Sequence, residues 1–356
     1  MSLDPVFEPL RQMPAPDFAD LPAVRARMAS MQAMLPRRRS ANVSFGDREI
    51  DGRDRKIKIR VYEPKRRGRG GALLYFHGGG FVVGDLDTEH PQCLDHAEHA
   101  GCVVVSVDYR LAPEFPFPAA HEDGWTALHW LAANAKTLGV DPARIAIGGG
   151  SSGATLAAGL ALRARDEGFS ALRLAMLVQP SLDHLQTQPS ARTFSDTPFL
   201  ASEHLPSIWR CYFGAHPPTG KALSYAAPAA AERLTGFPPV FLIVGEVDPL
   251  RDEALAFAMR LIADGVEVEL HLLAGAPHGF DLVEHAPVTQ LMRDARAAAL
   301  VRALSPDGVW RRRMVAANST FRLSAPLLVG AAKRFASWPA RQASTLVRSL
   351  FGRSER

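Results

Sequence analysis

Three residue types that together activate a hydroxyl nucleophile occur at well-separated points of this 356-residue chain. Ser151 lies within the pentapeptide Gly149–Gly153, Asp248 follows an apolar run, and His278 follows the next one. A serine hydroxyl is a weak nucleophile until a histidine accepts its proton and a carboxylate orients that histidine. The chain therefore carries the groups needed for acyl transfer through a covalent serine intermediate.

The residues around Ser151 have the pattern of a tight turn from a strand into a helix. The apolar run Ile145–Ile147 predicts the strand, and Ala154–Arg165 predicts the helix. Such a turn leaves almost no room beside the serine, so glycines must flank it. Glycine-rich turns also bind phosphate, but that reading needs a lysine and a serine where this chain has Ala154 and Thr155. A purely structural glycine turn remains the alternative.

Asp248 and His278 both follow runs that are typical of buried strands. Pro239–Val244 precedes the segment with Asp248, and Val266–Leu273 precedes His278. Strand exits of this kind, in the order serine, acid, histidine, are where partners of the serine are expected. Asp252 is an alternative acid, but we expect it on the first turn of the following helix, where the helix dipole favours acidic residues for structural reasons.

A second glycine-rich segment, His77–Phe81, follows the apolar run Ala72–Leu74. Three successive glycines allow backbone N–H groups to point at a negatively charged oxygen without side chains in the way. Each such donor is worth roughly 3 to 4 kcal/mol of transition-state stabilisation in well-studied enzymes. We expect the imidazole of the first residue to shape the loop. The predicted oxyanion donors are the N–H groups of Gly78, Gly79 and Ser152.

Five segments together resemble the hormone-sensitive-lipase-like branch of the α/β-hydrolases. They occur in the family's order between about residues 40 and 303, and they are His77–Gly80, Asp108–Glu114, Gly149–Gly153, Asp248–Glu253 and His278–Phe280. The resemblance implies an α/β-hydrolase fold, with a mostly parallel, doubly wound sheet flanked by helices and a helical cap. It also implies a carboxylesterase or lipase-like enzyme for short- to medium-chain acyl esters, which needs no cofactor. Ser151 would be the nucleophile, His278 the general base and acid, and Asp248 its orienting carboxylate.

Three positions depart from the common pattern of the resembled family. Many members carry aspartate directly before the serine and Gly-Asn after the pentapeptide. This chain has Gly150 before Ser151, and Ala154 and Thr155 after Gly153. None of these side chains would be the nucleophile, the base or an oxyanion donor. The departures therefore leave the subfamily and the shape of the acyl pocket open, and we expect the chemistry to be intact.

Two other functions use the same scaffold. An amidase, or a deacetylase of a small metabolite, would use the same nucleophile, base and donors. A non-catalytic binding protein, like the gibberellin receptors that resemble this family, would have lost the histidine of the triad. The presence of His278 argues against the binding protein.

The chain divides into three parts by pattern. Residues 1–40 are expected to form N-terminal cap helices, one of them at Leu21–Leu35. Residues 41–304 are the predicted catalytic domain, which opens with an antiparallel hairpin at Val43–Phe45 and Ile57–Tyr62. After residue 71, strands alternate with helices, which favours a mostly parallel sheet.

A cap insertion is expected near residues 183–225, where the alternation of strands and helices breaks down. This segment contains Trp209, Tyr212 and Phe213, which suit either an apolar substrate pocket or an ordinary aromatic core. Phe81, at the end of the glycine-rich segment, and Trp209 are the predicted substrate contacts.

Length and composition fit one large α/β domain. A chain of 356 residues with 47% hydrophobic content can bury a sizeable core without division into several domains. Its first residues, Met1–Pro5, lack the basic and apolar regions of a signal peptide. Cys93, Cys102 and Cys211 show no metal-ligand spacing and fit thiols in a reducing compartment. We therefore expect a cytoplasmic protein that holds no metal.

The formal net charge of +4 is unevenly distributed. From Arg302 to Arg356 there are eleven Lys or Arg residues and two acidic residues, which leaves the preceding chain with a charge of −5. Basic clusters such as Arg37–Arg39 and Lys65–Arg67 are short and typical of solvated loops. No nucleic-acid partner is expected.

The segment 305–356 extends past the usual end of the resembled family. It combines basic residues with apolar ones such as Phe335 and Trp338, as basic amphipathic helices do. Such a segment can bind an anionic membrane surface, pack on the hydrolase domain or stay unfolded. Weak peripheral membrane contact through 305–356 is our hypothesis.

Overall fold

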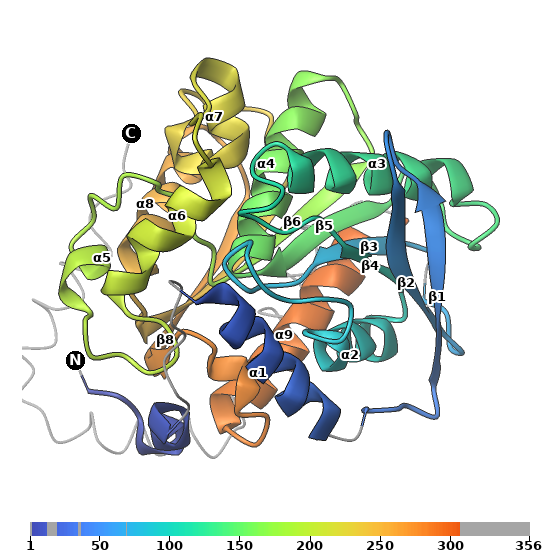
Figure 1. The fold of residues 1–356 in the computed structure, drawn as a ribbon. Helices are drawn as coiled ribbons and strands as arrows, with labels where there is room; N and C mark the ends of the chain where they lie inside the picture. Colours follow the sequence, from blue (N-terminus) through green and yellow to red (C-terminus); the bar gives the residue numbers. More distant parts are fainter. Residues whose placement is uncertain (1, 13–19, 35–36, 69, 307–356) are drawn as a thin grey trace, which may run out of the picture. The chain divides into compact units, whose positions relative to one another are not determined.

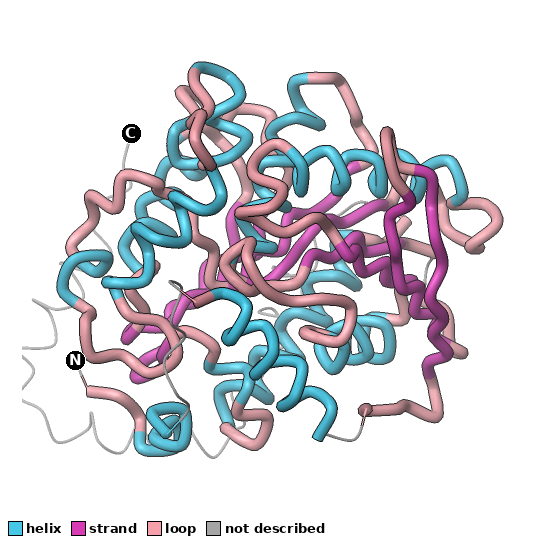
Figure 2. Tube along the Cα trace, in the orientation of Figure 1, coloured by secondary structure: helices cyan, strands magenta, loops and turns pink. Residues whose placement is uncertain are grey.

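Eight strands form a single sheet in the computed structural model, which describes residues 2–12, 20–34, 37–68 and 70–306 (Figures 1 and 2). The strands are β1 (Val43–Asp51), β2 (Lys56–Pro64), β3 (Ala72–Phe76), β4 (Val103–Asp108), β5 (Ile145–Gly150), β6 (Leu172–Val178), β7 (Val240–Val247) and β8 (Val268–Pro277). The predicted C-terminal extension, apart from its first two residues, lies outside the described residues.

The order of the strands creates a natural binding edge in the sheet. They follow one another in space as β1-β2-β4-β3-β5-β6-β7-β8, and all pairs from β4 to β8 are parallel. β1 and β2 form the expected antiparallel hairpin, and β2 also pairs antiparallel with β4. The chain winds from β3 to β4 on one side and returns to β5 on the other. Ligands bind beyond the carboxyl ends of strands at such a reversal.

Helices cover both faces of the sheet, as the fold-class prediction requires. α3 (Ala119–Asn134), α4 (Ser152–Asp166) and α8 (Arg251–Ala263) pack on one face, and α2 (His90–Ala100) and α9 (Pro287–Ala303) lie side by side on the other (Figure 1). Both faces of the central strands are thus buried, which explains their continuous apolar runs. The expected doubly wound α/β sheet is confirmed.

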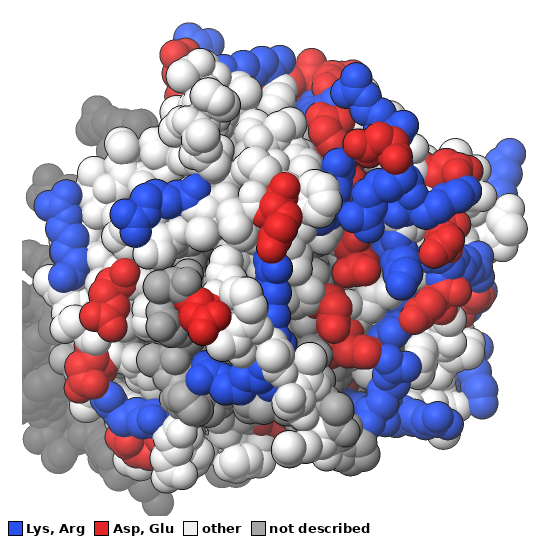
Figure 3. Space-filling model, viewed as in Figure 1, with Lys and Arg blue, Asp and Glu red and all other residues white. Residues whose placement is uncertain are grey.

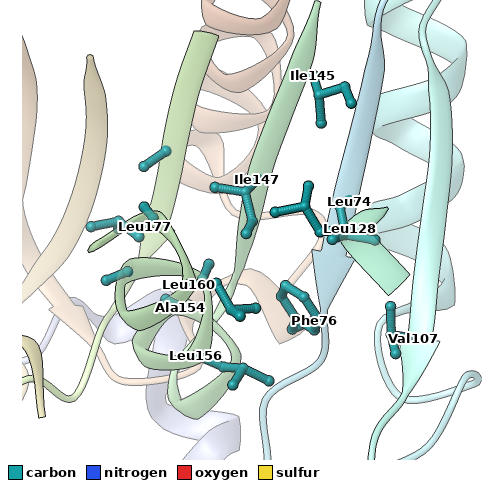
Figure 4. Close-up of a cluster of buried hydrophobic side chains, with 14 of the residues drawn as sticks. Leu74, Phe76, Val107, Leu128, Ile145, Ile147, Ala154, Leu156, Leu160 and Leu177 are labelled. Atoms are coloured by element: carbon teal, nitrogen blue, oxygen red, sulfur yellow. The ribbon is translucent and has the colours of Figure 1, made fainter. Parts of the chain in front are cut away.

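The core beneath α3 and α4 is closely packed. Phe76 of β3 points toward Leu160 of α4, in the same cluster as Leu128 and Ile147 (Figure 4). A Cβ at Gly124 would lie 2.6 Å from the Leu160 side chain, so only glycine lets α3 approach this closely. The packing fixes the positions of β3, β5 and α4, which carry both glycine-rich turns.

Further helices precede β1, connect β6 to β7 and follow β8. The N-terminal part of the chain forms η1 (Pro5–Gln12) and α1 (Leu21–Met34), close to the predicted helix. Between β6 and β7 the chain forms α5 (Ser190–Thr193), η2 (Ser202–His204), α6 (Leu205–Phe213), α7 (Gly220–Ala226) and η3 (Pro228–Ala230). A last short turn, η4 (Phe280–Leu282), follows β8. None of the helices in the described part of the chain is both long and apolar enough to cross a membrane.

Candidate active site

The structure brings Ser151, His278 and Asp248 together, each one residue beyond the end of a strand. Ser151 Oγ lies 3.0 Å from His278 Nε2, and His278 Nδ1 lies 2.9 Å from Asp248 Oδ2. Because a carboxylate can only accept, Nδ1–H donates to Asp248 and Nε2 is left to accept the serine proton. The three side chains form one chain of hydrogen bonds, with the distances that proton transfer from a serine requires.

The two candidate acids have different partners. Asp248 is fully buried, and its Oδ1 accepts a hydrogen bond from the Leu250 N–H at 2.8 Å, which fixes the carboxylate. Asp252 lies on the first turn of α8, as expected, and its Oδ2 accepts from the Ser190 N–H at 2.9 Å. Asp252 therefore ties α5 to α8, whereas the carboxylate beside His278 belongs to Asp248.

The turn at Ser151 is strained, and only glycine can flank it. Ser151 has φ 51° and ψ −120°, a conformation that costs a non-glycine residue of order 1 to 3 kcal/mol. A Cβ at Gly149 would lie 2.4 Å from the Phe76 carbonyl oxygen, and a Cβ at Gly153 would lie 2.1 Å from the same atom. The missing side chains let β5 and α4 close against β3 and hold the serine at the edge of the sheet.

Ala154 and Thr155, two of the departures from the family pattern, lie behind the serine. Both are fully buried, and Ala154 belongs to the core between α4 and the sheet (Figure 4). The Thr155 hydroxyl donates to the Ser181 carbonyl oxygen at 2.5 Å. Both side chains therefore pack beneath the turn, and neither takes part in the hydrogen-bond chain of the serine.

The prediction that Gly78 is an oxyanion donor is also corrected. Its N–H donates to Glu89 Oε1 at 2.7 Å, so it has no hydrogen bond left for a substrate oxygen. Among the hydrogen bonds of the described residues, none uses the N–H groups of Gly79, Gly80 or Ser152. Gly80 was not predicted, although its place in the same glycine run could have suggested it.

The imidazole of His77 holds the glycine loop from within, as expected. Its Nδ1 lies 2.7 Å from the Gly78 carbonyl oxygen, and its ring stacks on Tyr109 with 4.3 Å between the centroids. The Tyr109 hydroxyl donates to the His77 carbonyl oxygen at 2.8 Å. Burial lowers the pKa of His77 to about 4, so the ring is neutral and donates Nδ1–H to the Gly78 carbonyl.

α1 holds the same loop from outside through Arg25. The Arg25 guanidinium donates to the carbonyl oxygens of Val82 at 2.8 Å and Ala112 at 3.0 Å. It also pairs with Glu114 at 2.7 Å. One side chain of the N-terminal region thus joins the glycine loop to the segment after β4.

Phe81 and Trp209, the predicted substrate contacts, lie in an aromatic cluster. Phe81 stacks on Tyr212 with 3.7 Å between the centroids, and Trp209 lies 6.0 Å from Phe81. They are only 1% and 4% exposed, so neither ring offers a surface to a ligand. The prediction is corrected: the two rings fasten α6 to the glycine loop.

Two residues beside His278 were missed by sequence reasoning. The Phe199 ring lies parallel to the His278 ring with 6.2 Å between the centroids, and it is 38% exposed. Gln179 Oε1 accepts from the Gly279 N–H at 2.5 Å and so fixes the loop that carries His278. Both residues lie in irregular segments whose partners are far away in the chain, and no local pattern marks them.

Other reactive groups are placed unlike those of a metal or thiol enzyme. In the residues that the structure describes, no group of three or more His, Cys, Asp or Glu side chains could hold a metal ion. The cysteines are unpaired, and burial raises the pKa of the Cys93 and Cys102 thiols.

Comparison with known proteins places the chain in a family. Residues 73–282 match a family profile described as an α/β-hydrolase fold. The chain belongs to the hormone-sensitive-lipase-like α/β-hydrolases. The matched region of this hydrolase includes both glycine-rich turns and all three residues of the hydrogen-bond chain.

Relatives of the hydrolase include named esterases. It is 39% identical over 288 residues to esterase LipI of Mycobacterium tuberculosis, a match that covers 78% of this chain and 86% of the relative. It is 39% identical over 254 residues to carboxylesterase NlhH of the same organism, covering 70% and 79%. A solved structure of a bacterial heroin esterase superposes with a TM-score of 0.79 at 39% identity, covering 85% and 98%.

Proposed function

We propose that this hydrolase is a carboxylesterase that cleaves short- to medium-chain acyl esters through an acyl-serine intermediate. Its family and its esterase relatives support hydrolysis of an ester bond. The observation that carries the proposal is the hydrogen-bond chain from Ser151 Oγ through His278 to Asp248, with distances of 3.0 Å and 2.9 Å.

In the first half of the reaction, Ser151 Oγ attacks the ester carbonyl carbon while its proton moves to His278 Nε2. The tetrahedral intermediate collapses when His278 gives this proton to the departing alcohol oxygen and the carbon–oxygen bond breaks. In the second half, water attacks the acyl-serine carbonyl carbon and gives a proton to His278. His278 then returns this proton to Ser151 Oγ as the carbon–Oγ bond breaks and the carboxylic acid leaves. Asp248 stabilises the imidazolium in both halves without taking its proton.

The oxyanion of each intermediate is assigned to the N–H groups of Gly79, Gly80 and Ser152. These groups have no hydrogen-bond acceptor in the described part of the chain. Ser152 is also the first residue of α4, and the partial positive charge at the start of a helix favours an anion there. Gly78 is left out of this set because Glu89 occupies its N–H.

The surroundings of the nucleophile support an uncharged, apolar acyl group. The half-exposed Phe199 ring lies beside His278, and a Cβ at Gly80 would lie 3.3 Å from the Ile208 side chain of α6. On the face shown in Figure 3, charged side chains crowd the region of β1 and β2 and are sparse over α5 and α6. We assign Phe199 to the wall that meets the acyl chain, whereas Ile208 is buried in the aromatic cluster behind the glycine loop.

Substitution of the nucleophile tests the proposal. Ser151→Ala should lower kcat on p-nitrophenyl acetate by at least about 10⁴-fold and abolish labelling by a fluorophosphonate. Ser44→Ala on β1 is the matched serine control and should leave both unchanged. A Ser151→Ala protein that keeps the parent's esterase activity would contradict the assignment of Ser151 as the nucleophile. Across p-nitrophenyl esters from acetate to palmitate, kcat/KM should peak among the short and medium chains.

A further inference from the structure

We propose that Glu89 is a positioning residue of this site: its carboxyl group reaches in from the start of α2, fills the space beside Gly150 and holds Gly78 against the turn of Ser151. The inference rests on the proposed function, because it gives Glu89 a task in the same acyl-transfer reaction. Four observations of its surroundings carry it.

The Glu89 side chain does not cap its own helix. Glu89 is the N-cap residue of α2, a position where short polar side chains such as aspartate or serine accept a hydrogen bond from the first N–H groups of the helix. It makes no such bond. Instead Oε1 accepts from the Gly78 N–H at 2.7 Å, and Oε2 accepts from the Tyr75 hydroxyl at 2.5 Å. Both donors belong to β3 and its glycine loop, so the side chain ties α2 to the loop.

The same carboxyl group explains why residue 150 is glycine. A Cβ at Gly150 would lie 2.5 Å from Glu89 Oε1 and 2.9 Å from Oε2. Gly150 does not have a positive φ, so its backbone conformation is open to other residues. Any larger side chain at residue 150, an aspartate included, would collide with the Glu89 carboxyl group as it is placed here. In this chain a carboxyl group comes to that place from α2.

Glu89 thereby contacts both halves of the site. Gly78 lies against the serine turn, since a Cβ at Gly78 would be 3.2 Å from the Gly150 carbonyl oxygen and 3.4 Å from Ser151 Cβ. The next two residues, Gly79 and Gly80, carry the proposed oxyanion donors. A displacement of about 1 Å in such groups can cost 10²-fold in rate. By fixing Gly78, Glu89 sets the distance from the oxyanion donors to the nucleophile.

Burying the ionised Glu89 carboxyl group costs free energy, so its presence here indicates a functional role. Burial, and to a lesser degree Asp281, raise the pKa of Glu89 to about 7, against the opposing effects of the Tyr75 and Gly78 hydrogen bonds and of Arg296. An uncharged side chain would avoid this penalty. Perturbed carboxyl groups of this kind gather at functional sites.

The first experiment measures kcat, KM and the affinity for a trifluoromethyl ketone in variants of Glu89. The ketone forms an oxyanion when Ser151 attacks it, so its affinity reports on the oxyanion donors and separates a positioning role from a packing role. Glu89→Ala should lower kcat on p-nitrophenyl acetate by roughly 10- to 100-fold and lower the affinity for the ketone by a similar factor. It should change KM by less than about twofold. Glu89→Gln should keep most of kcat, because its amide oxygen can still accept from Gly78. A Glu89→Ala protein with the parent's kcat would overturn the inference, as would an equal loss for Glu89→Gln.

The second experiment uses the contact with Gly150. Gly150→Ala should displace the Glu89 carboxyl group and lower kcat about as much as Glu89→Ala does. The double variant should lose no more than Glu89→Ala alone, because the clash disappears with the side chain. Additive losses would contradict the proposal. If Glu89→Ala does not fold, an undiminished kcat in Gly150→Ala still overturns it.

Two controls keep the outcomes distinct. Asp264 also accepts a hydrogen bond from a backbone N–H, that of Leu234, after the last turn of α8. Asp264→Ala should lower stability and leave kcat and the ketone affinity unchanged. Ser151→Ala belongs to every set: if it stays active, the proposed function has failed, whereas an inactive Ser151→Ala beside a fully active Glu89→Ala rejects only the role of Glu89.

Discussion

The two glycine-rich turns of the site are built on different physical grounds. At the serine turn, Gly149 and Gly153 lie against backbone carbonyl oxygens, so the chain has one way to close and needs no side chain to hold it. The loop after β3 is held by side chains from elsewhere, among them Glu89 and Arg25. The first turn is therefore limited by backbone atoms that leave no room for a side chain at Gly149 or Gly153, and the second depends on side chains from distant parts of the chain.

Gly153→Ala should have the largest effect, because the serine turn has no other conformation that would make room for a side chain at this position. Its Cβ would lie 2.1 Å from the Phe76 oxygen and 2.5 Å from the His77 oxygen, and neither backbone atom can move aside. We expect a loss of more than about 4 kcal/mol in the free energy of unfolding, measured by denaturant titration. Gly46→Ala on β1, where a Cβ meets nothing within 4 Å, is the control. A stable Gly153→Ala protein would show that the serine turn is as adjustable as the loop.

Gly79→Ala should break the loop and spare the fold. Gly79 has φ 117°, and its Cβ would lie 2.2 Å from the Val83 carbonyl oxygen. The loop lies outside the sheet, so we expect a normal circular-dichroism spectrum and a kcat lower by about 10²- to 10³-fold, as for loss of one oxyanion donor. Gly236→Ala, also at positive φ but against only the flexible Arg165 side chain, should keep its kcat. If Gly79→Ala instead lost its folded structure, the glycine loop would be as necessary for the fold as the serine turn, and the difference between the two turns would be contradicted.

Glu89→Gln should remove the pH dependence that the Glu89 carboxyl group gives to the free energy of unfolding. Burial raises the pKa of Glu89 to about 7 in the folded protein, from the ordinary glutamate value of 4.5. The unfolded chain therefore releases its proton first, and the parent loses stability as the pH rises from 4.5 to 7. Above pH 7 the variant should be the more stable by up to about 3 kcal/mol, with the difference vanishing near pH 4.5. Denaturant titrations at several pH values measure this, and a constant difference would contradict it.

Arg25→Ala should have the smallest effect, because its side chain is partly exposed and holds the loop from outside. Losing its bonds to the Val82 and Ala112 carbonyl oxygens should raise the activation free energy by about 1 kcal/mol, a several-fold lower kcat. Arg25→Lys should not restore the rate, because an ammonium group cannot reproduce the fork of a guanidinium. Arg48→Ala removes an exposed pair with Glu63 on the hairpin and serves as the control. Parent-like kinetics for Arg25→Ala would mean that the loop does not need α1.

The contrast also explains what the sequence could and could not predict. The turn at Ser151 has local requirements, so its glycines, strand and helix could be read from consecutive residues. The strand exits placed Asp248 and His278 correctly because a parallel sheet brings all such exits to one edge. The fold class followed from the same alternation of strands and helices.

The errors concern residues whose role depends on distant partners. Gly78 looked like a donor because the contact that occupies it comes from Glu89, eleven positions later. Phe81 and Trp209 were predicted as pocket residues because an aromatic residue suits a substrate pocket and a buried core equally well, and its type alone does not show which of the two it joins. Phe199 was missed because it meets His278 only after an irregular segment of the chain has folded back.

The position of β8 has a consequence for how the enzyme fails. β8 lies at the end of the sheet, where β7 is its one neighbour among the described strands, and it carries His278 one residue beyond its end. Outermost elements open locally at lower free energy than central ones. On heating, the imidazole should therefore leave the serine before the central strands separate. Esterase activity should disappear several degrees below the melting of the sheet, and cooling from that interval should restore it at once.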